Sequence, residues 1–153
     1  MTRFTLNGGE VVLDLPGHAT LLQALRGPLG LSSSRFGCGA EQCGSCMVLL
    51  DGKPAYACAL GMDAVAGRKV VTVEGLGTSA VPHPLQAAFL AEQAGQCGYC
   101  LSGILISAAA LLAANPDPDE DAICAAMDPH LCRCGSHNRI IRAIRRAAQE
   151  LAQ

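Results

Sequence analysis

The sequence predicts an α+β fold in which a small mixed β-sheet with one helix is followed by a compact group of four helices. Two turn signals, Asn7-Gly8-Gly9 and Asp51-Gly52, each separate two strand-like segments, which is the pattern of β-hairpins. After residues 75–79 (GLGTS) the chain becomes rich in alanine with helical spacing. We therefore expect two domains, residues 1–76 and 77–153.

The N-terminal domain is expected to hold the sheet and its helix. Thr20 is a suitable N-cap for a short helix that ends at about Arg26, because Gly27-Pro28 does not continue a helix. Alternating and β-branched segments predict the strands. These lie at residues 3–6, 11–15, 47–50, 53–57 and 69–73.

The C-terminal domain is expected to be helical. Pro82 and Pro84 suit the beginning of a new element, since proline is favoured in the first turn of a helix. Four helices joined by short connections predict a compact bundle. They are expected at residues 84–94, 102–114, 120–127 and 138–151.

Composition argues against several classes of partner. The 153 residues carry a formal charge of −2 and only 3% aromatic side chains, with no Trp, so neither the basic face nor the stacking surface of a nucleic-acid binder is expected. The longest strongly apolar stretch, residues 104–114, is too short to cross a membrane. The N-terminus becomes polar within ten residues, so we expect a cytoplasmic protein without a leader.

Nine cysteines are the most informative feature of the composition. In a reducing compartment such a chain is better suited to binding metal than to forming disulfides. Eight of the cysteines form two sets of four, and the ninth, Cys124, lies in an apolar run where a thiol acts as a small hydrophobic side chain. Two complete sets leave no position for a Rieske-type histidine ligand. We therefore expect ordinary surface or core roles for His18, His83, His130 and His137.

The first cysteine set is typical of a plant-type 2Fe-2S ferredoxin, whose ligands follow C-x4-C-x2-C with a distant fourth cysteine. It consists of Cys38, Cys43, Cys46 and Cys58. Three thiolates from one loop must surround a small inorganic core, and Gly37, Gly39 and Gly44 permit the tight backbone path and inward-pointing amides that this requires. A structural zinc site is the alternative, but it more often uses two separate C-x2-C pairs.

The second cysteine set combines a C-x2-C with a C-x-C, each just before a predicted helix. It consists of Cys97, Cys100, Cys132 and Cys134. Helix N-termini carry partial positive charge, which lowers thiol pKa and favours an anionic cluster. The spacing alone leaves 2Fe-2S and zinc both open. A thioredoxin-like redox pair at Cys97 and Cys100 is disfavoured, because no βαβ pattern surrounds it.

Taken together, the two sets resemble the small iron-sulfur subunit of the molybdenum hydroxylases, the xanthine oxidase family. The resemblance covers nearly the whole chain, through FGCGAEQCGSCMVLLDGKPAYAC, QCGYCLSGILISAAALL and HLCRCGSHNRIIRAI. It implies a β-grasp, plant-type ferredoxin-like domain with one 2Fe-2S cluster, followed by a four-helix-bundle domain with a second. The implied role is electron transfer within an oxidoreductase, with no substrate chemistry and no catalytic residue on this chain.

The resemblance also implies the partners and the order of the clusters. The cluster of the helical domain would face a molybdopterin cofactor, of the cytosine dinucleotide form, in a large partner subunit. Gln96 matches the glutamine that hydrogen-bonds the pterin, and Cys134 matches the cluster ligand nearest to it. The alternative for Gln96 is that it is an exposed residue at a helix end without a functional role. Electrons would leave through the ferredoxin-like cluster to a cytochrome c or a flavin subunit.

Two segments depart from the common family pattern. Cys100 is followed by Leu101-Ser102-Gly103 where Thr-Pro-Gly is frequent, and CRC is followed by residues 135–140 (GSHNRI) where a Thr-Gly-Tyr run is frequent. These variants resemble the branch of isoquinoline and nicotinate dehydrogenases. That branch suggests an N-heteroaromatic compound or an aldehyde as substrate of the complex.

Two other functions agree with parts of the sequence. A free-standing two-cluster ferredoxin would shuttle electrons between diffusing partners, but the mixed charge gives it little steering field. A zinc-binding interaction module would use the same cysteines with no redox role, and it would be colourless where an iron-sulfur protein is red-brown.

Overall fold

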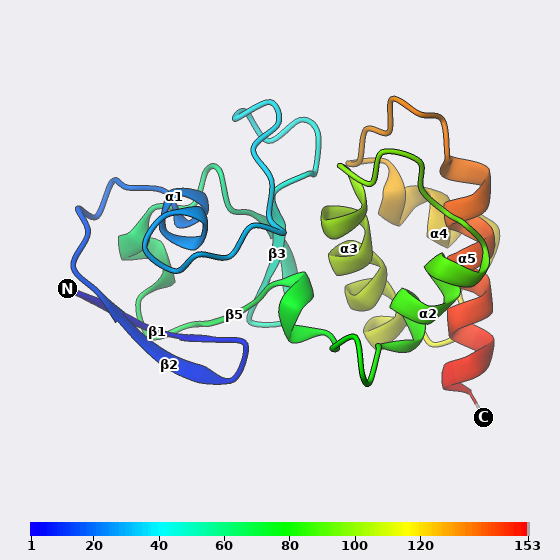
Figure 1. Ribbon diagram of the computed structural model, residues 1–153, viewed down its shortest axis with the longest axis horizontal. Coiled ribbons are helices and arrows are strands. Elements are labelled where there is room, and N and C mark those ends of the chain that lie inside the picture. The colour runs from blue at the N-terminus through cyan, green and yellow to red at the C-terminus, as the bar shows by residue number, and fades with distance from the viewer. Residues whose placement is uncertain (153) are drawn as a thin grey trace.

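The computed structural model describes residues 1–152 and places a sheet-containing half beside a helical half (Figure 1). One sheet has the strand order β2-β1-β5-β3-β4. Its strands are β1 (Thr2–Leu6), β2 (Gly9–Leu13), β3 (Met47–Leu50), β4 (Lys53–Tyr56) and β5 (Lys69–Val71). β1 runs parallel to β5, and the other neighbouring strands are antiparallel. The predicted α+β class with a mixed sheet is confirmed.

Helix α1 (Leu21–Arg26) packs on this sheet and begins at the predicted cap. The side chain of Thr20 accepts the backbone N–H of Gln23, and the Gln23 side chain accepts the backbone N–H of Thr20 in return. The buried face of α1 joins one hydrophobic core with Phe4 and Val48 of the sheet. Two short 3₁₀ helices, η1 (Met62–Val65) and η2 (Val73–Gly75), flank β5.

The second half consists of four helices around a separate core. They are α2 (Pro84–Ala91), α3 (Leu101–Ala114), α4 (Glu120–Met127) and α5 (His137–Leu151). Leu85, Ile104, Ile123 and Ile144, one from each helix, are fully buried in this core. None of the helices formed by residues 1–152 combines the length and apolar character needed to cross a bilayer.

Some element ends differ from those predicted, for local backbone reasons. The helix predicted at residues 84–94 ends at Ala91, because Gln93 takes a left-handed conformation with φ 49°. The first hairpin turn comprises Asn7 and Gly8, both with positive φ, so β2 begins directly after it at Gly9. The strand predicted at residues 11–15 therefore lies at Gly9–Leu13.

The strand predicted at residues 69–73 ends at Val71. The backbone N–H of Thr72 donates to Asn7 Oδ1 at 2.9 Å, so it leaves the sheet ladder and η2 follows. A side chain in the first hairpin therefore ends β5, and nothing in the local sequence of β5 indicates this.

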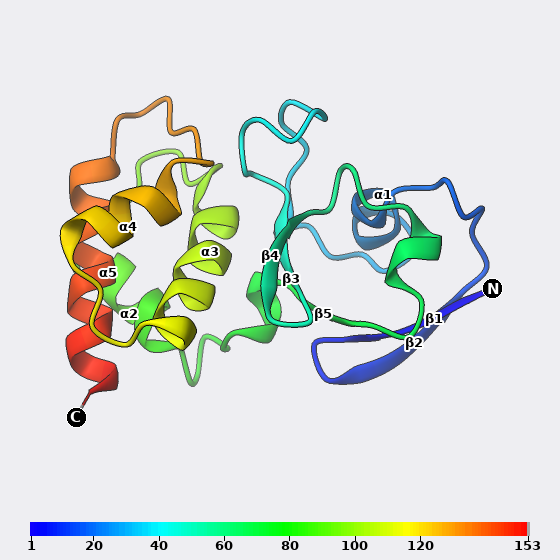
Figure 2. The same ribbon diagram turned by 180° about the vertical axis from the view of Figure 1, so that it is seen from behind.

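The two halves meet along β3 and α3. The loop between α1 and β3 and the loop between α4 and α5 project from the same end of the molecule, as both views show (Figure 2). These two loops carry five of the eight cysteines of the two sets, Cys38, Cys43, Cys46, Cys132 and Cys134.

Candidate functional site

The first cysteine set lies in a loop whose amides point at its own sulfurs. The backbone N–H groups of Ala40 and Gln42 donate to Cys38 Sγ at 3.4 and 3.2 Å, and the N–H of Cys38 donates to Cys43 Sγ at 3.4 Å. Glycines make this path possible, as predicted. A β-carbon on Gly37 would lie 2.6 Å from Cys43 Sγ, which is too close for any side chain.

The fourth cysteine of this set reaches the loop through strand pairing. Cys58 follows β4, and the N–H of Ala57 donates to the carbonyl of Cys46 at 3.3 Å. The pairing of β3 with β4 thus fixes Cys58 beside Cys46, whose thiol it contacts. The β3–β4 hairpin therefore brings the fourth cysteine, Cys58, next to the loop that carries the other three.

Two thiols of this set differ in how readily they ionise. Hydrogen bonds from the backbone amides of Ala40 and Gln42 lower the pKa of Cys38 to about 7. Burial raises the pKa of Cys46 to about 12, and the nearby Cys58 and Cys43 thiols add to the rise. A thiolate at Cys46 therefore needs a cation beside it, and the iron of a cluster supplies that charge.

The second set is built by the approaches to α3 and α5. Cys100 is the N-cap residue of α3, and Cys132 and Cys134 lie just before α5. The N–H of Tyr99 donates to Cys97 Sγ at 3.5 Å and is the main reason that the pKa of Cys97 is lowered. The predicted placement of both cysteine pairs at helix starts is confirmed.

A cavity lies among the thiols of the second set. It has a volume of about 360 Å³ and is lined by Cys97, Cys100 and Cys132 together with Ser45 from the first loop. Burial raises the pKa of Cys100 to about 12, with a further rise from Cys132. As at Cys46, a buried thiolate here requires a neighbouring cation, so the donor set fits an iron-sulfur cluster.

The thiols of the second set approach one another in pairs. Cys97 contacts Cys134, and Cys100 contacts Cys132. A two-iron cluster takes two thiolates on each iron, which two pairs of thiols can provide.

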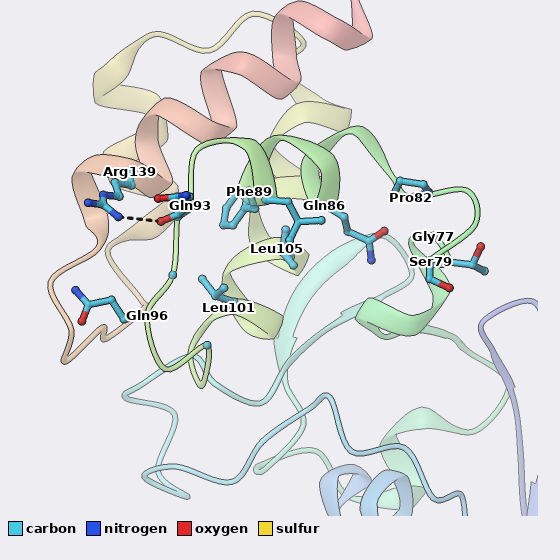
Figure 3. A pocket seen from close by; sticks show the side chains of 15 residues that line it. Gly77, Ser79, Pro82, Gln86, Phe89, Gln93, Gln96, Leu101, Leu105 and Arg139 are labelled. Carbon is cyan, nitrogen blue, oxygen red and sulfur yellow. Dashed lines mark hydrogen bonds between the residues drawn. The ribbon is translucent and has the colours of Figure 1, made fainter.

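Gln96 and Cys134 are brought together, as the resemblance implies. The Gln96 side chain donates from Nε2 to the carbonyl of Cys134 at 3.4 Å and is exposed. It lies at one end of a cavity of about 800 Å³ that continues past Phe89 and Leu105 to Pro82 (Figure 3). Arg139, whose guanidinium donates to the carbonyl of Gln93 at 3.3 Å, borders the same end.

Contacts between the two cysteine loops were not predicted from the sequence. Arg35 donates to the carbonyl of Gly98 at 2.8 Å, and its guanidinium lies 5.1 Å from the centre of the Tyr99 ring. The Tyr99 hydroxyl in turn donates to the carbonyl of Phe36. Each of these residues is close in sequence to a predicted ligand, but no spacing rule pairs them.

The four histidines lie in four different surroundings. His18 is exposed, and His83 caps α2 by accepting the N–H of Leu85 at 3.1 Å. His137 Nε2 lies 3.3 Å from the carbonyl of His130. His130 is buried against the first cysteine loop, as one of the expected core or surface positions.

Cys124 lies on α4, apart from both sets, beside a small cavity that Met127 also lines. The Cys124→Ser variant is expected to retain both clusters and to lose about 1 kcal/mol of stability or less. Electron paramagnetic resonance of the reduced protein checks this. Cys46→Ser is the matched change of a predicted ligand and should lose one cluster signal. Loss of a cluster signal from Cys124→Ser would show that the ligand sets are wrongly drawn.

Comparison with known proteins agrees with this geometry. Residues 4–70 match the model of a 2Fe-2S iron-sulfur cluster binding domain, and residues 72–145 match that of a 2Fe-2S binding domain. The chain is 44% identical to a nicotinate dehydrogenase subunit of Pseudomonas putida over 144 residues, covering 94% of this chain and 92% of that one. It is 48% identical to the alpha subunit of isoquinoline 1-oxidoreductase of Brevundimonas diminuta over 153 residues, covering 99% of this chain and 100% of that one.

A solved structure shows the same fold along the whole chain. The crystal structure of quinoline 2-oxidoreductase from Pseudomonas putida 86 superposes with a TM-score of 0.94 at 35% identity, covering 99% of this chain and 94% of the matched chain. Two cysteine sets in contacting loops, two 2Fe-2S domain matches and full-length relatives lead to one assignment. The chain belongs to the small iron-sulfur subunits of the molybdenum hydroxylases, the xanthine oxidase family, which transfer electrons within an oxidoreductase.

Proposed function

We propose that this chain conducts electrons singly from a molybdopterin centre in a large partner subunit, through two 2Fe-2S clusters, to an external acceptor. The observation that carries the proposal is the contact between two loops that each present cysteines of a different set. The N-terminal cluster is held by Cys38, Cys43, Cys46 and Cys58. The C-terminal cluster is held by Cys97, Cys100, Cys132 and Cys134.

When bound, each cluster supplies a one-electron redox centre. The chain itself binds, orients and shields these centres. The amides of Ala40 and Gln42 favour negative charge on the Cys38 sulfur, and the Tyr99 amide does the same at Cys97. Cys46 and Cys100 are buried, which limits the access of water to one side of each set.

The helical cluster faces the molybdopterin in this proposal. Gln96 is exposed and adjacent to Cys134, and beyond the bond to the Cys134 carbonyl its amide keeps one N–H and its oxygen for a ring that presents both donors and acceptors. The cofactor is the cytosine dinucleotide form. The acceptor is a cytochrome c or a flavin subunit, reached from the loop that carries Cys38, the exposed thiol of the first set.

The substrate of the complex is an N-heteroaromatic compound or an aldehyde. The names of the two relatives and of the solved structure, which refer to nicotinate, isoquinoline and quinoline, favour the first. All nine cysteines are free, which suits the reducing cytoplasm. The chain divides into a β-grasp domain, residues 1–76, and a four-helix bundle, residues 77–153; two separate cores support a two-part chain, and Val73 and Leu76 next to the boundary already pack against the helical core.

Metal analysis of the purified complex tests this function. This chain should carry about four irons and four acid-labile sulfides, and a large molybdenum-containing subunit should co-purify with it. A free-standing ferredoxin would give the same iron count with no such subunit. Zinc in place of iron, with no sulfide, would refute the redox role altogether.

A further inference from the structure

His130 lies between the loops that carry the two cysteine sets. It belongs to the connection from α4 to α5, and only 3% of its surface is exposed. One side of its ring faces α3 and the other faces the loop of the first set. A buried imidazole in this place has to be explained by what each of its nitrogens contacts.

The Nε2 atom anchors the ring to α3. It lies 2.7 Å from Ser107 Oγ, a hydrogen-bond distance. When the hydrogen sits on Nε2 and is donated to Ser107, Nδ1 is left as a buried acceptor with no hydrogen-bond partner among the described residues.

The Nδ1 side of the ring packs against the backbone of Gly44. A β-carbon on Gly44 would lie 2.2 Å from Nδ1 and 2.8 Å from the carbonyl oxygen of Pro129. The α-hydrogen of Gly44 that points in this direction therefore faces the bare nitrogen, which gives a weak C–H contact and a close van der Waals approach. Gly44 has φ +73°, so its backbone path is also one that other residues rarely adopt.

The residues next to this contact connect the two sets directly. The N–H of Leu131 donates to the carbonyl of Cys43 at 3.1 Å. Leu131 lies between His130 and Cys132, and Cys43 precedes Gly44. One hydrogen bond therefore links the backbones of a predicted ligand of the first set and a neighbour of a predicted ligand of the second.

We propose that His130 is a positioning residue for electron transfer between the two clusters, with its ring as the spacer that fixes the loop of Cys43 and Gly44 against the segment of Leu131 and Cys132. In this role His130 does not need to contact the predicted ligand thiols of either cluster. It acts through the Gly44 backbone and through the Cys43–Leu131 hydrogen bond.

The test compares His130→Ala and His130→Gln in the assembled complex. When both clusters are reduced, their unpaired spins split each other's resonance signals, and this dipolar splitting falls with the cube of their separation. His130→Ala should retain its iron and sulfide but lose the single well-defined splitting, because the two loops are no longer held at one separation, and electron transfer from the second cluster to the first should slow. His130→Gln, which can keep the donor to Ser107 while losing the ring, should give a smaller loss.

Leu112→Ala is the matched control. Leu112 is buried at the far end of α3, so its truncation makes a cavity of similar cost without touching either cysteine loop. It should leave the splitting unchanged. Unchanged splitting and rate in His130→Ala would overturn the proposal, and so would an equal loss in Leu112→Ala. If His130→Ala fails to load its clusters, the splitting of His130→Gln decides: a wild-type value overturns the proposal.

Discussion

Replacement of Gly103 by alanine is expected to force the two halves of the molecule apart where their cysteine loops meet. A β-carbon on Gly103 would lie 2.0 Å from the carbonyl oxygen of Gly44 and 3.0 Å from its carbonyl carbon. The obstacle is backbone, so no side-chain rotation relieves it. Gly103 is in α3, where alanine is otherwise favoured over glycine by about 1 kcal/mol. Overpacking typically costs about 1–3 kcal/mol, and a clash with fixed backbone should reach or exceed the upper value.

The measurement is the denaturant concentration at which the visible absorbance of the bound clusters disappears, since a metal-containing two-domain chain need not unfold in one step. Gly103→Ala should lower this concentration and weaken the coupling between the clusters. Gly9→Ala is the control, because its β-carbon would meet only an ordinary contact of 3.6 Å with the carbonyl of Leu6. It should change stability by about 0.5 kcal/mol or less. Equal stability of the two variants would show that the halves are not in this contact.

Loss of either cluster should abolish turnover with the external acceptor, but at different steps. Cys43→Ser removes a predicted ligand of the first set, so electrons should reach the helical cluster and stop there. Cys134→Ser removes a predicted ligand of the helical cluster, beside Gln96. Electrons from the molybdopterin should then not reach the ferredoxin-like cluster. Steady-state assays should give only background activity in both cases. Only variants that still assemble are informative, because cluster binding contributes to folding.

Local signals in the sequence predicted the elements well. The Thr20 cap, the proline at the start of α2 and the Asp51-Gly52 turn all act over a few residues, and the corresponding elements begin where expected. One error arises where a distant group decides the backbone. Asn7 ends β5 from the turn of the first hairpin, and nothing near residue 72 in the sequence indicates it.

The cysteine sets were also accessible from the sequence, because cluster ligation imposes spacing within short loops. The packing between the loops was not. Gly44 was expected to serve the wrapping of a cluster, and its positive φ agrees, but His130 and Pro129 also require a glycine there. This contact is made by steric fit between residues far apart in the chain, so no periodicity or motif in the sequence indicates it.

Rapid-mixing electron paramagnetic resonance of the assembled complex tests the proposed electron path most directly. Substrate is mixed with wild-type, Cys43→Ser and Cys134→Ser complexes, and the reduction of each cluster is followed by its own signal. In the wild type the helical cluster is expected to be reduced before the ferredoxin-like cluster, and in Cys43→Ser it alone should be reduced. In Cys134→Ser the ferredoxin-like cluster should stay oxidised. Its reduction at the native rate in that variant would contradict the proposed order.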